Sequence, residues 1–96
     1  MLKAYDDRDG HIWMDGNLVP WRNANVHILT HALHYGSSVF EGERAYNGKI
    51  FKSREHSERL IKSGNYIDVP VPYSVDEIEE AKSLVLSNLG LKDAYI

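Results

Sequence analysis

Two tight-turn signals constrain this 96-residue chain more than any other feature. Asp15-Gly16 and Asn47-Gly48 are residue pairs that tolerate the positive φ angles of a type I′ turn. Both turns are flanked by short runs containing apolar residues, at 11–14, 17–21, 39–46 and 49–52. The pattern predicts two antiparallel hairpins. Pro20 lacks an amide donor, so the second strand lies at a sheet edge or ends there.

Two helices are predicted in the second half of the chain. The first covers about 54–66 and turns Leu60, Ile61 and Gly64 inward. The second covers 74–89, and both of its ends are marked. Ser74 and Glu77 form a capping box, and Gly90 supplies the left-handed residue after the last turn. Apolar residues recur along it at helical spacing: Val75, Ile78, Ala81, Val85 and Leu89.

The remaining segments complete the expected organisation. Residues 1–10 are predicted to be a loose leader, and 22–38 a polar, histidine-rich connection with a helical turn at 29–34. A last strand begins at 93–96. The resulting fold class is α+β, a small domain in which an antiparallel, hairpin-rich sheet packs with two helices. A strand that ends the chain would leave an exposed sheet edge, so the sequence is interpreted as part of a longer protein.

Composition excludes several classes of function. The chain has no cysteine, so disulfides and thiolate metal sites are impossible. Its net charge is −3, and the basic residues are scattered among acidic ones, which is not the footprint of a nucleic-acid or anionic-membrane binder. The start lacks a signal peptide's apolar core, and no run approaches the roughly 20 apolar residues of a membrane span. We therefore expect a cytoplasmic protein with no nucleic-acid partner.

Some ionisable residues have a plain structural interpretation. His27, His31 and His34 have helical spacing, but we expect loop histidines bonded to backbone and no metal site. Glu41 and Glu43 share one strand face and are expected to be solvated or paired. Lys62 and Lys82 resemble solvated helix lysines.

Two features suggest ligand binding, and each has an alternative. A glycine within a strand often marks where a ligand approaches the backbone, so Gly42, between Phe40 and Arg44 on one face, fits a pocket; a bulged hairpin fits as well. Arg59 can offer a guanidinium fork to phosphate. From the residues alone, a surface salt bridge is the favoured interpretation of Arg59.

Four ordered motifs resemble a known family. They are Trp13-Met-Asp-Gly-Asn-Leu-Val-Pro-Trp21, His31-Ala-Leu-His-Tyr-Gly-Ser-Ser-Val-Phe-Glu-Gly42, Arg54-Glu-His-Ser-Glu-Arg-Leu60 and Asp93-Ala-Tyr-Ile96. Together they resemble the opening of class IV, fold-type IV aminotransferases, and most closely the branched-chain amino acid aminotransferases. The resemblance implies that residues 11–96 are a small N-terminal domain beside a larger C-terminal domain, which this chain lacks.

The resemblance also implies roles for individual residues. Arg59 matches the arginine that binds the phosphate of pyridoxal 5'-phosphate, the implied cofactor. Phe40, Gly42 and Tyr95 match residues that line the substrate pocket. Tyr35 matches a tyrosine that reaches into the neighbouring subunit, which implies a homodimer or a larger homo-oligomer. No residue here matches the catalytic position, because the family's Schiff-base lysine lies downstream.

The implied reaction is the reversible transfer of an amino group from leucine, isoleucine or valine to 2-oxoglutarate. The implied partners are therefore a small amino acid and a 2-oxo acid. The 96 residues alone are expected to be inactive. Two alternatives remain: a D-amino acid or amine transaminase of the same fold, and a non-catalytic, dimerising α/β interaction domain.

Overall fold

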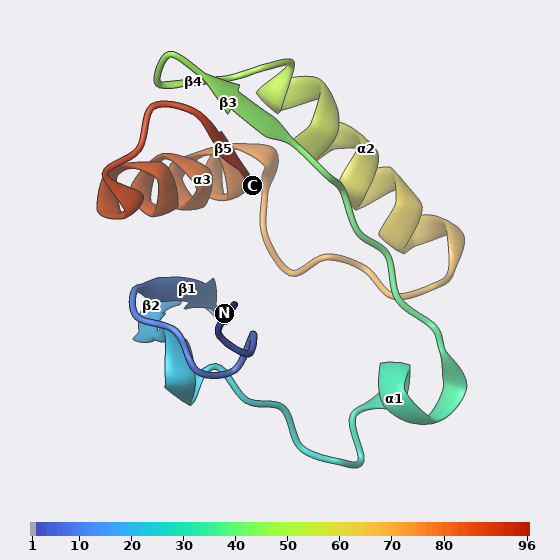
Figure 1. The fold of residues 1–96 in the computed structure, drawn as a ribbon. Helices are drawn as coiled ribbons and strands as arrows, with labels where there is room; N and C mark the ends of the chain where they lie inside the picture. Colours follow the sequence, from blue (N-terminus) through green and yellow to red (C-terminus); the bar gives the residue numbers. More distant parts are fainter. Residues whose placement is uncertain (1) are drawn as a thin grey trace.

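The computed structural model describes residues 2–96 and shows two antiparallel sheets and two long helices (Figure 1). The expected α+β class is confirmed. In chain order the elements are β1 (His11–Met14), β2 (Asn17–Pro20), the 3-10 turn η1 (Trp21–Asn23), α1 (His31–Tyr35), β3 (Arg44–Tyr46), β4 (Lys49–Ile50), α2 (Ser53–Tyr66), α3 (Val75–Leu89) and β5 (Ala94–Tyr95).

The first hairpin forms as predicted. Asp15 and Gly16 have φ angles of 51° and 96°, and β1 pairs antiparallel with β2, with Trp13 opposite Leu18. β2 ends at Pro20, as its missing donor requires. The hairpin lies against α3, and the Trp13 ring contacts that of Tyr73 edge to face at 5.0 Å.

Residues 2–10 contain no helix or strand but are tied to the turn η1 that follows the hairpin. Arg22 forms ion pairs with Asp7 at 2.9 Å and with Asp9 at 2.7 Å. The Trp21 ring nitrogen also donates a hydrogen bond to the carbonyl oxygen of Tyr5. The segment is therefore held against the hairpin by specific polar contacts.

The second hairpin has the predicted turn but shorter strands than predicted. Asn47 and Gly48 have φ angles of 51° and 80°. The strand prediction for 39–46 is wrong before residue 44, because within residues 2–96 no strand pairs with residues 39–43. The return strand also stops at Ile50. Two residues later Lys52, the residue before α2, takes a φ of 52°, which ends the extended conformation.

The last predicted strand, β5, is present and completes the second sheet in the order β4-β3-β5. Arg44 lies opposite Tyr95, and Ala45 lies opposite Ala94. One step earlier, Glu43 and Ile96 exchange backbone hydrogen bonds of 3.2 and 2.8 Å. The C-terminal residues thereby lie beside the segment that leads into β3.

Both long helices lie where the sequence predicts them. α2 begins one residue early, and its Gly64 is buried where an added Cβ would lie 2.7 Å from the carbonyl oxygen of Val69. In α3 the capping box is complete: Glu77 N donates to Ser74 Oγ, and Ser74 N donates to Glu77 Oε1. Gly90 ends α3 with a φ of 73°.

The interior between α2, α3 and β3 contains a polar network. Ser57 is fully buried and donates a hydrogen bond of 2.5 Å to Glu79. The expectation that Lys82 is a solvated lysine is wrong, because its side chain is only 9% exposed. Its ammonium group donates to Glu43 at 2.6 Å and to the carbonyl oxygen of Ser53 at 2.9 Å.

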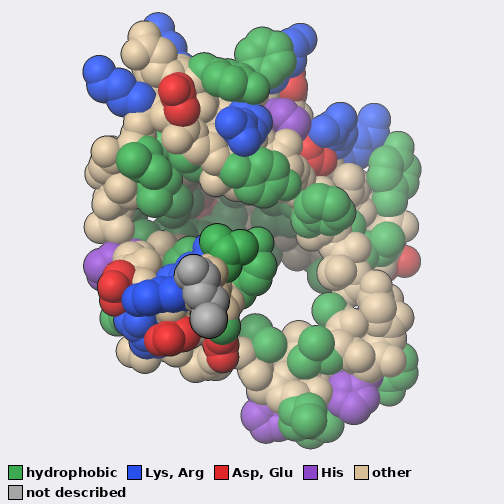
Figure 2. All heavy atoms as spheres, in the orientation of Figure 1, with side chains coloured by type: hydrophobic (Ala, Val, Ile, Leu, Met, Phe, Trp, Pro, Cys, Tyr) green, Lys and Arg blue, Asp and Glu red, His purple; other side chains and the backbone are tan. Residues whose placement is uncertain are grey.

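A long arm, defined here as residues 24–43, carries α1 away from both sheets (Figure 1). α1 occupies His31–Tyr35, close to the predicted turn at 29–34, and stops at Gly36 with a φ of 70°. Figure 2 shows open space between the arm and the rest of the molecule, with apolar and histidine side chains on the arm. The radius of gyration, 14.3 Å, exceeds the roughly 13 Å of a compact 100-residue domain because of this arm.

Among residues 2–96, no helix combines the length and the apolar character that a membrane crossing requires.

Candidate functional site

The candidate site is centred on the carboxylate of Glu41, which receives three hydrogen bonds from α2. Arg59 donates from Nε to Oε2 at 2.8 Å and from Nη2 to Oε1 at 2.6 Å. His56 Nδ1 lies 2.6 Å from Oε1. His56 and Arg59 are three residues apart on one helix stripe, so a single acceptor can reach both. The expectation that Glu41 is paired is confirmed.

These contacts set the charges of the site. The hydrogen bonds from Arg59 and then from His56 lower the pKa of Glu41 to about 2. The same hydrogen bond, with the Glu41 charge, raises the pKa of Arg59. Glu41 is therefore an anion and Arg59 a cation at neutral pH.

A hollow of about 230 Å³ opens beside this ion pair. It is lined by the first two turns of α2 and the residue before them: Lys52, Glu55, His56 and Arg59. The Arg59 side chain is 65% exposed, and among residues 2–96 its Nη1 has no hydrogen-bond partner. Arg59 therefore keeps donors for a further acceptor, which is the chemistry that a phosphate group requires.

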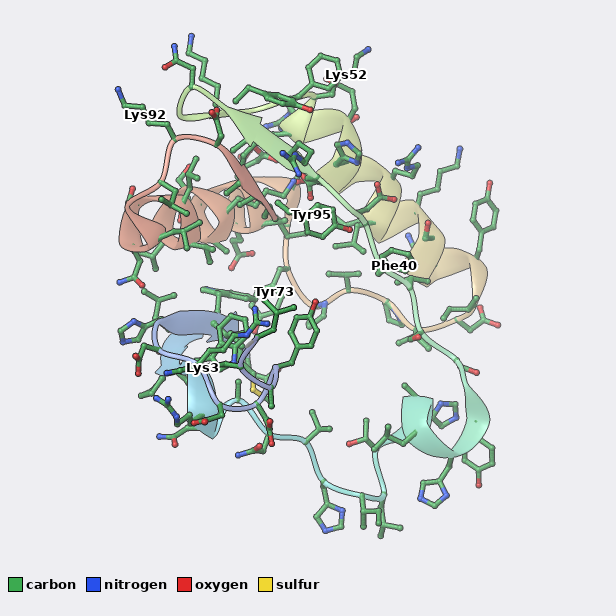
Figure 3. All side chains as sticks on the ribbon, viewed as in Figure 1. Lys3, Phe40, Lys52, Tyr73, Lys92 and Tyr95 are labelled. Atoms are coloured by element: carbon green, nitrogen blue, oxygen red, sulfur yellow. The ribbon has the colours of Figure 1, made fainter. Side chains whose placement is uncertain are left out.

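Gly42 and Tyr95, two predicted pocket residues separated by half the chain, lie against each other. A Cβ built on Gly42 would meet the Tyr95 hydroxyl at 2.5 Å and its ring at 3.3 Å. In this structure the group that lies close to Gly42 is the Tyr95 side chain, and the approach of a ligand there stays a prediction. In Figure 3 the labelled Tyr95 lies beside the segment that rises from Phe40 to β3.

Phe40 and Tyr35 are not gathered with the other predicted residues. Phe40 is 84% exposed, and Tyr35, at the end of α1, is 75% exposed. The Tyr35 ring contacts His31 at 4.7 Å within its own helix. Both side chains are therefore open to contact from other groups.

Glu41 and His56 join the site although neither was predicted to bind a ligand. The sequence places Glu41 on the face opposite Phe40, and this alternation is confirmed, because Glu43 and Ala45 are buried on the same face. His56 and Arg59 are three residues apart in the sequence, which puts them on one side of α2. The available signal was a carboxylate expected to be solvated or paired, together with two potential donors at helical spacing. Their pairing depends on how α2 packs against the arm.

The arm histidines have local partners. Leu29 N donates to His27 Nδ1 at 3.0 Å, and His34 Nε2 lies 2.9 Å from the carbonyl oxygen of Ile28. The expectation of backbone-bonded loop histidines is confirmed for these two. Within residues 2–96, the structure brings together no cluster of three or more candidate metal ligands.

Comparisons with known proteins show the family to which the chain is similar. The family model for amino-transferase class IV matches residues 38–96, which include all the residues of the Glu41 cluster and both Gly42 and Tyr95. A probable branched-chain-amino-acid aminotransferase of Rickettsia felis is 60% identical over 86 residues, which are 90% of this chain. The branched-chain-amino-acid aminotransferase of Pseudomonas aeruginosa is 49% identical over 94 residues.

Solved structures show the same fold. A branched-chain aminotransferase from Thermoproteus uzoniensis, determined with norvaline, matches with a TM-score of 0.85 and 40% identity over 92% of this chain. A second branched-chain amino acid aminotransferase, solved in complex with N-(5'-phosphopyridoxyl)-L-glutamate, matches with a TM-score of 0.86 and 40% identity. The chain spans about 30% of the length of these relatives. With a family model that covers more than half of its residues, this chain belongs to the class IV aminotransferase family.

Proposed function

We propose that the protein containing this chain is a branched-chain amino acid aminotransferase that uses pyridoxal 5'-phosphate. It would move the amino group of leucine, isoleucine or valine to 2-oxoglutarate, reversibly. Family membership supports the reaction class, and the names of the relatives from Rickettsia felis and Pseudomonas aeruginosa support the substrate class. The phosphopyridoxyl compound in the second matching structure supports the cofactor.

The observation that carries the proposal is the position of Arg59. Its guanidinium is held by Glu41 on one edge and is exposed on the other, beside a hollow on α2. The next residue after Glu41 is Gly42, whose open face is covered by Tyr95. A phosphate anchor and a substrate-facing wall are thus joined through two consecutive residues, which fits a cofactor whose phosphate and reactive ring are held together.

In this proposal four residues of the chain have defined roles. Arg59 binds the cofactor phosphate, and the remaining phosphate contacts come from the rest of the protein. Phe40, Gly42 and Tyr95 line the space for the substrate side chain. When bound, the cofactor serves as an electron sink for the amino-acid carbon. The lysine that moves the proton belongs to a C-terminal domain outside these 96 residues.

Tyr35 has a task between subunits in this proposal. It stands on the exposed arm, and we propose that it reaches into the site of a neighbouring subunit, in a homodimer or larger homo-oligomer. The exposed apolar residues of the same arm support an interface there: Val26, Ile28, Leu29 and Leu33. An enzyme of this kind would act on small soluble metabolites.

The substitution Arg59→Gln tests the cofactor role. Losing a charge-assisted hydrogen bond should weaken binding of pyridoxal phosphate by about 1.5–3 kcal/mol, or about 10- to 150-fold. The measurement is an absorbance titration of the full-length apoprotein with pyridoxal phosphate. Arg54→Gln is the matched control, because Arg54 lies on the same helix and pairs with Glu58 and Asp76 at the surface. Equal affinities for the wild type and Arg59→Gln would remove Arg59 from the cofactor site.

A further inference from the structure

We propose that Glu41 is a positioning residue, which holds Arg59 and His56 in the orientation that receives the cofactor phosphate. This inference rests on the proposed function, in which Arg59 binds that phosphate. Glu41 itself is not placed against the cofactor. It acts through the two side chains that line the hollow on α2.

The first step of the argument is the edge of Arg59 that Glu41 uses. The carboxylate takes Nε and Nη2, the side edge of the guanidinium. The two hydrogen bonds fix the plane of the guanidinium, because they run side by side to the two oxygens of one carboxylate. The end that carries Nη1 remains without a partner among residues 2–96 and is free to bind an anion.

The second step concerns the protonation of His56. Nδ1 lies 2.6 Å from Glu41 Oε1, and a carboxylate anion only accepts, so Nδ1 must donate its hydrogen there. The 3.4 Å approach of Arg59 Nη2 to the same nitrogen is then a contact between two donors. Glu41 therefore fixes the ring orientation of His56 and leaves Nε2 facing away from the ion pair, as a carboxylate does for a metal-bound histidine.

The third step is the rigidity of the anchor. The Glu41 side chain is 8% exposed, whereas that of Arg59 is 65% exposed. Two residues on, Glu43 is fixed by buried Lys82, and Ala45 is fully buried on the same face. The segment that carries Glu41 is thus held in place by Glu43 and by Ala45. The buried Glu41 carboxylate therefore holds the exposed guanidinium of Arg59 in one orientation before a ligand binds.

Ordering matters because an arginine side chain loses rotamer freedom when it binds a ligand. If Glu41 has already fixed the Arg59 side chain, phosphate binding does not lose that conformational entropy again. The opposing effect is repulsion between the Glu41 anion and the phosphate. The two effects predict opposite signs for the loss of the Glu41 charge: positioning predicts weaker binding of phosphate, and repulsion predicts tighter binding.

The test compares pyridoxal phosphate with pyridoxal, which lacks the phosphate group, on the full-length apoprotein. Glu41→Gln should weaken pyridoxal phosphate by about 10-fold, the low end of what removing an orienting partner costs at metal sites. The affinity for pyridoxal should stay unchanged. Glu41→Asp, which keeps the charge on a shorter side chain, should lie between Glu41→Gln and the wild type. Glu58→Gln, which removes an exposed partner of Arg54, is the control and should bind both compounds as the wild type does.

A second readout does not depend on the cofactor. The readout is the NMR spectrum of the apoprotein with ¹⁵N-labelled arginine. The Nε–H signal that is present in the wild type and missing from Arg59→Gln is assigned to Arg59. It should exchange slowly with water in the wild type and quickly in Glu41→Gln. If Glu41→Gln does not fold, the cofactor affinities of Glu41→Asp and the exchange rate of this signal in Glu41→Asp decide the question.

The outcomes separate this inference from the proposed function. If Arg59→Gln binds pyridoxal phosphate as the wild type does, the cofactor role of Arg59 fails, and the inference fails with it. If Arg59→Gln is weaker but Glu41→Gln binds as well as the wild type or better, only the positioning role is overturned. Equal weakening of pyridoxal and pyridoxal phosphate by Glu41→Gln also overturns it. Support requires a phosphate-specific loss that disappears when Glu41→Gln is made in the Arg59→Gln protein.

Discussion

Lys82 is surrounded by oxygen atoms in the interior between β3, α2 and α3. Glu43 lies 2.6 Å and Glu79 3.3 Å from its ammonium group. Burial acts to raise the pKa of Glu79, but hydrogen bonds from Ser57 and Ser53 and the charge of Lys82 lower it overall. Both carboxylates therefore depend on one buried cation, and the free energy of unfolding should depend on it too.

Lys82→Met should destabilise the protein by about 3–5 kcal/mol, because it leaves the Glu43 carboxylate buried without a cation. Adding Glu43→Leu should recover part of this loss, because it removes one of the two carboxylates left without a cation. Glu79 keeps its hydrogen bonds from Ser53 and Ser57. The measurement is urea unfolding of the full-length protein. Lys62→Met, an exposed lysine on α2, is the control and should change stability by less than about 0.5 kcal/mol. A Lys82→Met protein as stable as the control would contradict the structure.

Gly42→Ala should raise the Michaelis constant for leucine and leave the cofactor spectrum intact. The new Cβ would lie 2.5 Å from the Tyr95 hydroxyl, so the exposed ring must move from its place. Repeating the change in a Tyr95→Phe protein removes the colliding atom, and the effect of Gly42→Ala should then be smaller. An equal effect in both backgrounds would show that Tyr95 is not the neighbour that Gly42 accommodates.

At these positions the sequence predicted residue types better than pairings. The alternation of 39–46 placed Glu41 and Glu43 together on one face, but it did not predict that Glu43 is buried there. The sequence could not predict that Lys82 is buried, because a lysine on a helix normally reaches water. Its partner, Glu43, is 39 residues away in the chain. For the same reason the pairing of Arg59 with Glu41 required the structure.

Among the elements, α3 has the most complete local signals, and its start provides a test. Ser74→Ala removes the hydrogen bond from Glu77 N to Ser74 Oγ and should cost about 1 kcal/mol. Ser87→Ala makes the same change at an exposed position within α3, where alanine favours the helix, and should not destabilise. Comparison of the two variants by urea unfolding of the full-length protein measures the cap. Equal stabilities would mean that the capping box contributes nothing.

The elements that the sequence predicted well are those determined by nearby residues. The two Asx-Gly turns and the ends of α3 each depend on a few adjacent positions. The predicted strand at 39–46 was too long because a strand needs a neighbour. Within residues 2–96, β4 and β5 pair only with residues 44–46 of this segment. Alternating side chains predicted which residues share a face, but they could not show which face is buried or where strand pairing begins.

At the scale of the whole molecule, the chain exposes much more surface than its size requires. Its accessible area is 7499 Å², whereas a compact monomer of 11.0 kDa exposes about 5,600 Å². Among residues 2–96 the only fully buried hydrophobic residue is Ala45. Several large apolar side chains of the arm are exposed, and so is Tyr95; those of the arm include Val26, Ile28, Leu29, Leu33 and Phe40. Under the proposed function, these surfaces meet the rest of the enzyme and a second subunit, where the substrate pocket is completed.

Transamination by the full-length protein tests the central claim most directly. With pyridoxal phosphate and 2-oxoglutarate present, we expect glutamate to form when L-leucine, L-isoleucine or L-valine is added, and not with D-leucine. Under the proposed function the proton-moving lysine is none of these 96 residues, so the 96-residue chain alone should form no glutamate. Glutamate production is measured against time for both proteins under the same conditions. Turnover by the 96 residues alone, or a cofactor-loaded full-length protein that uses D-leucine or none of the three L-amino acids, would contradict the account.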